Sequence, residues 1–346
     1  MPQLLSFGMI GASSIGPAAL LEPAARRDDV SVVRVAARRA GAAERYASAW
    51  NVPKSSSRYE DVLADREVDA VYISNAAVDH ARWTIEALQA GKHVLCEKPI
   101  AVSREEAGAI RRAASASGRV AMEGFHYRFH PLFGAIGDLV RSERLGPLDA
   151  IRSTVNGKRA YDPASILQSK PAGGGALLHN GVYAVHWSRL LFDAEPLTAR
   201  ASQRLNPTGA DSDTAAELEF PGGRSAIVHC SFDRDDPVSV TLSFASAQVV
   251  ATGVIAPHLG HSLRVVPDVG PSTVMTVAGA SSFDYQLAEF ARRAAAAAGT
   301  GPEPAAAYGR GDDIEGNLAA IDAIRLAAST GEVEEITPAE AERDGS

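Results

Sequence analysis

Short apolar runs alternate with stretches of helical periodicity over the first third of the chain. The apolar runs cover residues 4–10, 30–37, 68–75, 92–98 and 119–125, and the helical stretches cover 17–27, 40–50, 59–66, 80–91 and 103–118. Apolar runs without alternating polar positions predict strands that are buried on both faces. Because helices separate these strands, the pattern predicts βαβ units and a parallel sheet. Ser103 and Glu106 match a capping box for the last helix, and Gly118 marks its end.

The pattern changes after about residue 122. A predicted helix at 131–146 and a strand at 147–157 precede a helix-like run at 173–187. Residues 197–278 hold many strand-like runs with turn signals, including a hairpin around Pro221-Gly222-Gly223. This pattern is typical of a mostly antiparallel sheet. We therefore predict an α/β domain over residues 1–122 and an α+β domain over residues 123–346.

Three further segments complete the predicted second domain. Residues 283–299 and 312–329 have helical periodicity, and residues 299–309 read as a Gly/Pro/Ala linker.

Composition excludes several classes of protein. The chain of 346 residues has a formal net charge of −8 and no dominant basic stripe, which argues against binding to nucleic acid. It has two cysteines, Cys96 and Cys230, each in an apolar run, so neither a disulfide framework nor a cysteine metal cluster is expected. No apolar run approaches about 18 residues, and the N-terminus lacks the basic segment of a signal peptide. We expect a cytoplasmic protein that does not span a membrane.

A glycine turn follows the first predicted strand and opens a helix. Its residues are Gly11, Ser13, Ser14, Ile15 and Gly16. Glycines at the first and last positions suit the tight turn and the close helix–strand packing of a dinucleotide-binding fingerprint. Serine replaces the middle glycine, which weakens the match, although its small hydroxyl side chain is compatible with a site. The N-terminus of the following helix would face the phosphates.

The second predicted strand ends in Arg38 and Arg39 with no adjacent acid. An acid at this position suits the ribose 2′-hydroxyl of NAD, whereas arginine suits the 2′-phosphate of NADP. We therefore expect NADP as the cofactor, with NAD as the alternative.

Several motifs together resemble one family. They are the GxSxxG turn, DAVYISN followed by His80, AGKHVLCEKP, MEGFHYRFHP, and GGGALL followed by a Gly-x-Tyr step. In this order they resemble the Gfo/Idh/MocA family, and in particular the branch that holds glucose–fructose oxidoreductase, dimeric dihydrodiol dehydrogenase, xylose dehydrogenase and the sugar 3-ketoreductases. The resemblance covers nearly the whole chain. It implies an N-terminal Rossmann domain, a C-terminal domain with a large open sheet, and NAD(P)-dependent oxidation or reduction of a sugar or related polyol.

The resemblance also implies roles for individual residues. It places the catalytic lysine on Lys98 and the catalytic tyrosine on Tyr183. Tyrosine would be the general acid in reduction and the general base in oxidation, with the lysine ammonium lowering its pKa. The expected cofactor-binding residues beyond the glycine turn and the two arginines are Asn75, His80, Glu97, Lys98 and Pro99, and the expected substrate-lining residues are Arg128, His130, His179 and Asn180.

One position departs from the family pattern. An aspartate usually stands four residues before the catalytic tyrosine, and this chain has His179 there. Either the histidine hydrogen-bonds the substrate in place of the carboxylate, or it has a structural role and activity is altered or lost. The spacing of His179, Tyr183 and His186 predicts that all three rings share one helix face, with His186 in a packing role. A zinc site is not expected, because the histidines lack the usual ligand spacing.

The leading hypothesis is therefore an NADP-dependent oxidoreductase acting on a sugar or keto-sugar. The alternative is a catalytically altered family member that binds NADP as a sensor. A sheet with one face uncovered by helices would expose apolar area, so a homodimer or homotetramer is expected.

Overall fold

The chain folds into two units in the computed structural model, which describes residues 4–301 and 313–337. Among the described residues, the first unit consists of residues 4–130 and 280–301, and the second of residues 131–279 and 313–337. The division differs from the predicted ranges mainly at residues 280–301, which lie between two parts of the second unit in sequence but group with the first.

The first unit is built on a parallel sheet of six strands in the order β3-β2-β1-β4-β5-β6. The strands are β1 (Leu5–Ile10), β2 (Val30–Ala36), β3 (Lys54–Ser56), β4 (Ala70–Ile73), β5 (His93–Cys96) and β6 (Ala121–Glu123). The order reverses between β1 and β4, which is the switch point where doubly wound sheets bind ligands. The predicted parallel Rossmann sheet is confirmed, with the short edge strand β3 as an addition.

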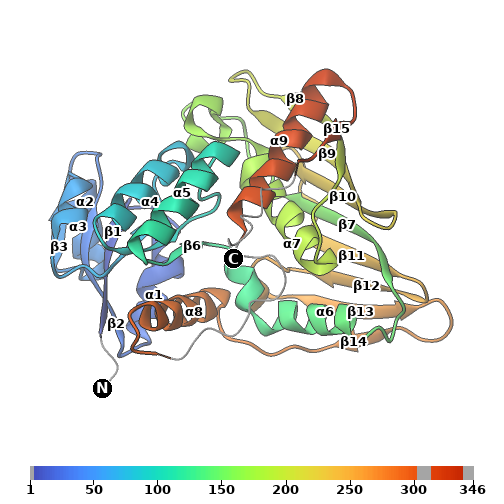
Figure 1. Ribbon diagram of the computed structural model, residues 1–346, viewed down its shortest axis with the longest axis horizontal. Helices are drawn as coiled ribbons and strands as arrows, with labels where there is room; N and C mark the ends of the chain where they lie inside the picture. The colour runs from blue at the N-terminus through green and yellow to red at the C-terminus, as the bar shows by residue number, and fades with distance from the viewer. Residues whose placement is uncertain (1–3, 302–312, 338–346) are drawn as a thin grey trace, which may run out of the picture. The chain divides into compact units, whose positions relative to one another are not determined.

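Helices connect these strands (Figure 1). They are η1 (Pro17–Leu21), α1 (Glu22–Ala25), α2 (Ala42–Trp50), α3 (Glu60–Ala64), η2 (Ala77–Asp79), α4 (His80–Gln89), α5 (Arg104–Ser117) and η3 (His126–Phe129). The predicted cap of α5 is present: Ser103 Oγ accepts from the backbone N–H of Glu106 at 3.3 Å, and the Glu106 carboxylate accepts from the N–H of Val102 at 2.9 Å. Gly118 ends the helix with φ +65°.

Helix α8 (Ser282–Ala297) belongs to the core of the first unit. Its Phe283, Leu287 and Phe290 lie in one buried cluster with Phe7 of β1 and Leu20 of η1. The rings of Phe7 and Phe290 are 5.4 Å apart. Burial of these side chains stabilises the packing of α8 on the parallel sheet. Helix α8 therefore completes the core of the first unit.

The second unit is built on a sheet of nine strands in the order β14-β13-β12-β11-β7-β10-β9-β8-β15. The strands are β7 (Leu148–Asn156), β8 (Thr198–Leu205), β9 (Asp211–Phe220), β10 (Arg224–Ser231), β11 (Ser239–Phe244), β12 (Ala247–Thr252), β13 (Ser262–Pro267), β14 (Thr273–Met275) and β15 (Glu334–Glu335). Only β7 and β10 pair in parallel among these described strands. The predicted, mostly antiparallel sheet and its Pro-Gly-Gly hairpin are confirmed.

Helices cover one face of this sheet. They are α7 (Val182–Phe192) and α9 (Ile314–Thr330), while α6 (Pro131–Arg141) and the short helices η4 (Ile166–Gln168), η5 (Lys170–Ala172), η6 (Leu177–Gly181) and η7 (Pro257–Leu259) complete the unit. Every residue of α7 is buried, and its Trp187 donates to Ser153 Oγ of β7 at 2.7 Å. Alternate residues of β9 and β10 point to the opposite face, which carries partly exposed and exposed side chains.

A buried arginine joins the two covering helices. Arg189 of α7 is fully buried, pairs with both carboxylate oxygens of Glu195, and also contacts Asp313 Oδ2 at 2.8 Å. Asp313 caps α9 by accepting from the N–H of Gly316 at 3.0 Å. The guanidinium of Arg189 is therefore paired with two carboxylates, which offsets the free-energy cost of burying its charge.

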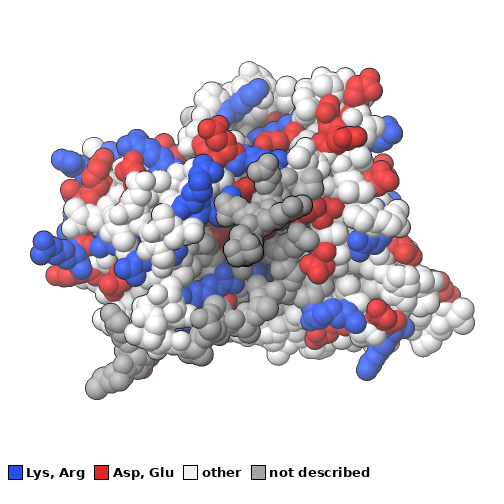
Figure 2. Space-filling model, viewed as in Figure 1, with Lys and Arg blue, Asp and Glu red and all other residues white. Residues whose placement is uncertain are grey.

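Other expectations have mixed outcomes. Residues 177–187 of the helix-like run at 173–187 are helical, but the first turn is the π-helical η6, so α-helical spacing does not apply across residues 177–181. The predicted linker lies mostly outside the described residues. In the described part of the chain, no helix is long and apolar enough to cross a membrane. Figure 2 shows basic and acidic side chains interspersed over the visible face.

Candidate functional site

The glycine turn after β1 has a geometry that its two glycines require. Gly11 has φ +106°, and a Cβ there would lie 2.9 Å from the backbone carbonyl of Ser74. A Cβ on Gly16 would collide with the Tyr46 hydroxyl. Both positions therefore demand glycine, one for backbone conformation and close approach and the other for packing against α2.

Ser13 ties this turn to the end of β4. Its hydroxyl donates to Ser74 Oγ at 2.8 Å and accepts from the N–H of Gly16 at 3.2 Å. The serine that replaces the middle glycine thus orders the loop. Ser14 and Ile15 remain exposed at the N-terminus of η1, where free N–H groups favour an anion.

Asn75 presents an unsatisfied amide at the carboxyl end of β4. Its Oδ1 and Nδ2 atoms are buried, and neither has a hydrogen-bond partner among the described residues. Buried amides in native proteins normally have partners, so an orphan at the switch point indicates a group that a ligand satisfies. On this observation the residues present fit a dinucleotide.

His80 connects Asn75 to the corner after β5. Its ring nitrogens lie 2.8 Å from the carbonyl of Pro99 and 3.2 Å from the carbonyl of Asn75. The ring is buried, and burial lowers the pKa of His80. A neutral ring donates to only one of these carbonyls, and the buried ring packs between the two loops that carry them.

Glu97, Lys98 and Pro99 form the corner itself. The Lys98–Pro99 peptide bond is cis. Glu97 Oε1 accepts from the Tyr72 hydroxyl at 2.9 Å. Burial raises the pKa of Glu97, and the neighbouring Lys98 ammonium opposes that shift. Lys98 is partly buried, so a charged amine lies at the carboxyl end of the sheet.

The two arginines after β2 differ in their surroundings. The guanidinium of Arg38 lies over the rings of Tyr59 and Trp83, at 4.7 and 5.6 Å. It is half exposed and forms a long ion pair of 3.5 Å with Asp79. Arg39 is exposed and pairs with no acid in the described residues. Both cations are accessible to an anionic ligand.

Residues 126–130 of the HYRFHP segment lie in the first unit rather than in the predicted second domain. His126 bonds Ser282 Oγ at 2.8 Å and stacks on Phe283 at 3.9 Å. His130 is buried, with its ring edge-on to Tyr285 at 5.7 Å, and the Arg128 guanidinium lies over Phe129. The segment lies in the first unit because it packs on α8, which groups with that unit.

Tyr183 stands at the start of α7, and the preceding turn is fixed by a buried acid. Asp211 Oδ2 accepts from the N–H of Leu177 at 2.7 Å and from the Thr214 hydroxyl at 2.8 Å. Any Cβ on Gly175 would collide with the Asp211 carboxylate. Burial raises the pKa of Asp211, and the bonds from Leu177 and Thr214 oppose that rise. The entry to the tyrosine helix is therefore defined by residues 34 positions apart.

His179 and Asn180 lie one turn before Tyr183, beside residues that the sequence pattern did not single out. The ring of His179 is 5.8 Å from that of Phe232, and the guanidinium of Arg159 lies 4.8 Å from the same ring. Asn180 is buried and its Nδ2 donates weakly to the carbonyl of Ser231 at 3.4 Å. Tyr183 and His186 are both buried in α7.

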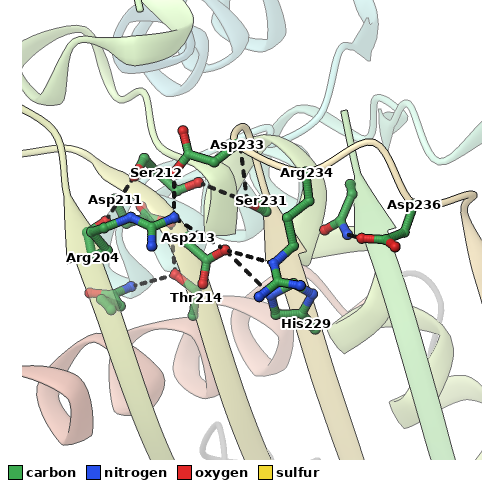
Figure 3. A network of polar contacts seen from close by, with 12 residues as sticks. Arg204, Asp211, Ser212, Asp213, Thr214, His229, Ser231, Asp233, Arg234 and Asp236 are labelled. Atoms are coloured by element: carbon green, nitrogen blue, oxygen red, sulfur yellow. Dashed lines mark hydrogen bonds and ion pairs between the residues drawn. The ribbon is translucent and has the colours of Figure 1, made fainter. Parts of the chain in front are cut away.

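A polar network lies on the face of the sheet that the helices leave uncovered (Figure 3). It is located where β9 begins and β10 ends. Asp213 Oδ2 lies 3.4 Å from Nε2 of His229 and 3.6 and 3.7 Å from the guanidinium groups of Arg204 and Arg234. Asp233 pairs with Arg204 at 2.6 Å, and Asp236 accepts from Asn156 at 3.1 Å. The arginines of this network are thus matched by carboxylates.

Metal ligands do not gather anywhere in residues 4–301 and 313–337: no group of three or more His, Cys, Asp or Glu side chains could hold an ion. The described site residues form two groups, one around β1, β4 and β5 in the first unit and one around η6 and α7 in the second.

Family comparisons agree with this architecture. Residues 5–125 match the model of an oxidoreductase family with an NAD-binding Rossmann fold, and residues 133–250 match the GFO/IDH/MocA C-terminal domain. The chain belongs to the Gfo/Idh/MocA family. The resemblance of the motifs is therefore confirmed, as is the class of enzyme: an NAD(P)-dependent oxidoreductase.

Curated relatives match this family member over part or nearly all of its length. It is 37% identical over 224 residues to an uncharacterized oxidoreductase of Rhizobium meliloti, covering 64% of this chain and 67% of that protein. It is 29% identical to a D-xylose 1-dehydrogenase (NADP(+)) of Haloferax volcanii, covering 96% of this chain and 100% of the relative. The crystal structure of an aldose-aldose oxidoreductase from Caulobacter crescentus has a TM-score of 0.85 at 23% identity, over 96% of this chain and 100% of the other, which shows the shared fold.

Proposed function

We propose that this Gfo/Idh/MocA protein is an NADP-dependent oxidoreductase that acts on a sugar, a keto-sugar or a related polyol. The observation that carries the proposal is the orphaned amide of Asn75 at the switch point, next to the Gly11 turn, whose conformation requires glycine. The name of the full-length relative from Haloferax volcanii, a D-xylose 1-dehydrogenase (NADP(+)), supports the cofactor and the class of substrate.

Different residues of the first unit would bind different parts of the dinucleotide. Gly11, Ser13 and Gly16 shape the turn, and the backbone at Ser14 and Ile15 would receive the pyrophosphate. Arg38 and Arg39 would receive the 2′-phosphate of NADP, because a guanidinium fork matches a phosphate.

The carboxyl ends of β4 and β5 would hold the nicotinamide side. There the amide of Asn75 would gain its partner, while His80, Glu97 and Pro99 fix the corner that carries Lys98. When bound, the nicotinamide supplies or accepts a hydride.

We assign the proton to Tyr183. A free tyrosine has a pKa of about 10, so a phenol that exchanges a proton near neutrality needs a nearby cation. The resemblance to the family assigns this role to Lys98, which would also stabilise negative charge on the reacting oxygen. His179 and Asn180 would bind the hydroxyls of the substrate from the turn before Tyr183, and the same resemblance assigns Arg128 and His130 to the substrate.

The test of the function is turnover with a panel of aldoses and keto-sugars, followed by the absorbance of NADPH. We expect turnover of at least one sugar, and a Tyr183→Phe variant slower by about 100-fold or more, because it removes the acid–base group and little else. Binding of NADPH without turnover of any sugar, together with a Lys98→Ala variant that is unchanged in every property, would contradict the proposal and favour a sensor.

The choice of cofactor has its own test. Arg38→Ala should reduce the preference for NADPH over NADH by about tenfold, the effect of one lost charge-assisted contact. Arg112→Ala, which removes an exposed arginine from α5, is the matched control. An unchanged ratio of the two dissociation constants in Arg38→Ala would refute the assignment of the 2′-phosphate.

We also propose that the protein assembles as a homodimer or homotetramer through the face of the second sheet that the helices leave uncovered.

A further inference from the structure

Arg159 is held rigidly just after β7. Its N–H donates to the carbonyl of Phe232 at 2.9 Å, its Nε donates to the carbonyl of Gly157 at 3.3 Å, and its guanidinium lies over the Phe232 ring. The side chain is partly buried. Stacking on an aromatic ring orients the plane of the guanidinium while leaving its outer N–H groups available.

No carboxylate neutralises this guanidinium among residues 4–301 and 313–337. Burial lowers the pKa of Arg159, and no acid contributes to the shift. The loop after Phe232 has three acids: Asp233 pairs with Arg204, Asp236 accepts from Asn156 (Figure 3), and Asp235 is exposed and forms no ion pair with Arg159. A partly buried cation without a counter-ion costs free energy, and an anionic ligand would recover it.

A second donor converges on the same point. At the position where a Cβ of Gly157 would stand, Arg159 Nη2 is 3.6 Å away and Asn180 Nδ2 is 3.7 Å away. Apart from the glycine and its two chain neighbours, no other described heavy atom lies within 4 Å of that point. The space beside Gly157 is therefore flanked by two N–H donors.

This space adjoins the helix that carries the proposed acid. Asn180, in the π-helical turn η6, precedes Tyr183 by three residues, and the Phe232 ring contacts both Arg159 and His179. A sugar bound at Tyr183 has functional groups within a few ångströms of its reacting carbon, so a substituent could reach this point.

We propose that Arg159 and Asn180 bind an oxyanion of the substrate, so that the preferred sugar carries a carboxylate or a phosphate. The inference rests on the proposed function and specifies its substrate class. A neutral hydroxyl would satisfy the hydrogen bonds but would leave the charge of Arg159 uncompensated, whereas a carboxylate or phosphate meets the guanidinium with two parallel bonds.

The experiment compares neutral and acidic versions of the same sugars. D-Glucose, D-glucuronate and D-glucose 6-phosphate, and the corresponding galactose series, are tested as substrates with NADP and are titrated calorimetrically into the protein loaded with NADP. We expect kcat/KM for a uronate or a sugar phosphate to exceed that of its neutral parent by about tenfold or more. The uronate and phosphate arms identify which oxyanion is preferred.

Variants of Arg159 and of its neighbour distinguish specific recognition of the oxyanion from a general effect of positive charge. Arg159→Ala should reduce the acidic-to-neutral ratio by about tenfold to 100-fold, and Arg159→Lys, which keeps the charge and loses the fork, should restore part of it. Lys158→Ala removes an exposed charge from the neighbouring residue and should leave the ratio unchanged. Near-ultraviolet circular dichroism checks that each variant is folded.

The outcomes distinguish the two proposals. Turnover of neutral sugars without preference for any acidic one, and a ratio unaffected by Arg159→Ala, would overturn the oxyanion site and leave the enzyme in place. Absence of all turnover, with calorimetric binding of a uronate or sugar phosphate that Arg159→Ala abolishes, would overturn the proposed activity and support the oxyanion site. If neither turnover nor Arg159-dependent binding is found, both fail.

Discussion

His93 shows how a single residue of the AGKHVLCEKP motif can serve stability. Its ring is buried at the start of β5. Nδ1 accepts from the N–H of Val120 at 3.1 Å, and Nε2 lies 3.3 Å from the guanidinium of Arg119. Burial, together with the Arg119 charge and against the weaker pull of Asp69, lowers the pKa of His93 to about 4. Donors on both sides favour the neutral ring.

This environment predicts a loss of stability in mild acid. Unfolded histidine takes up a proton below about pH 6.5, whereas the folded ring does so only near pH 4. The unfolded state therefore binds more protons between these values, and stability falls as the pH falls through that window. Integration gives a loss of about 2 kcal/mol between about pH 8 and about pH 5 from this group.

Urea denaturation of the wild type and of His93→Gln at both pH values measures this contribution. Glutamine can still accept from the N–H of Val120, so the variant should fold and should lose less stability in acid. His261→Gln, in the second unit, is the control. An equally steep acid limb in the wild type and in His93→Gln would show that other groups cause it.

At the scale of single residues, the sequence predicted those residues whose role depends on the local backbone conformation. Gly11, Gly16 and Gly118 were predictable because a turn or cap requires their backbone conformation. Arg159 and Asp211 were not, because their importance arises from contacts with Phe232 and Leu177, which are distant in sequence. No periodic pattern records such pairings.

At the scale of elements, most helices and strands followed from hydrophobic periodicity and caps. Strands β4 and β5 of the parallel sheet are buried at every position and are continuous apolar runs, which made them easy to recognise. The three-residue strand β3 has no buried residue and gave no such signal. The π-helical turn η6 also escaped, because Asp211 and Gly175 set the entry to α7 through tertiary contacts.

The placement of α8 could not be read from the chain order. Its apolar face reads equally well as packing on either sheet, and the choice is made by Phe7 and Leu20, which lie about 260 residues or more earlier. Sequence order assigned the helix to the second domain, whereas shape complementarity to β1 and η1 groups it with the first unit.

At the scale of the whole molecule, the uncovered face of the nine-stranded sheet bears on assembly. Its centre places Ile227 of β10 between Arg152 of β7 and Glu217 of β9. The face thus mixes charges with apolar side chains, which corrects the expectation of a simply apolar surface. A self-complementary pattern of this kind suits a two-fold interface, in which each acid meets a base of the other copy.

The proposed assembly predicts a dimer or tetramer in sedimentation velocity at micromolar concentration. Ile227→Glu places a negative charge at the centre of the face on both copies. We expect monomers, because burying two unpaired carboxylates in the interface would cost more free energy than the remaining contacts between the copies provide. Leu326→Glu changes an exposed leucine of α9, which lies on the covered side, and should leave the assembly intact. A wild-type monomer would refute the proposal.

The return of α8 has a consequence for recombining proteins of this family. The unit that carries the glycine turn is formed by two separate stretches of the chain, one that ends at residue 130 and one that begins at residue 280 and contains α8. A chimaera that exchanged only the first piece would join a foreign β1 and η1 to a helix shaped for other partners, and Phe290 would meet a surface that did not evolve with it. Cofactor preference can therefore be transplanted as a module only when both pieces travel together.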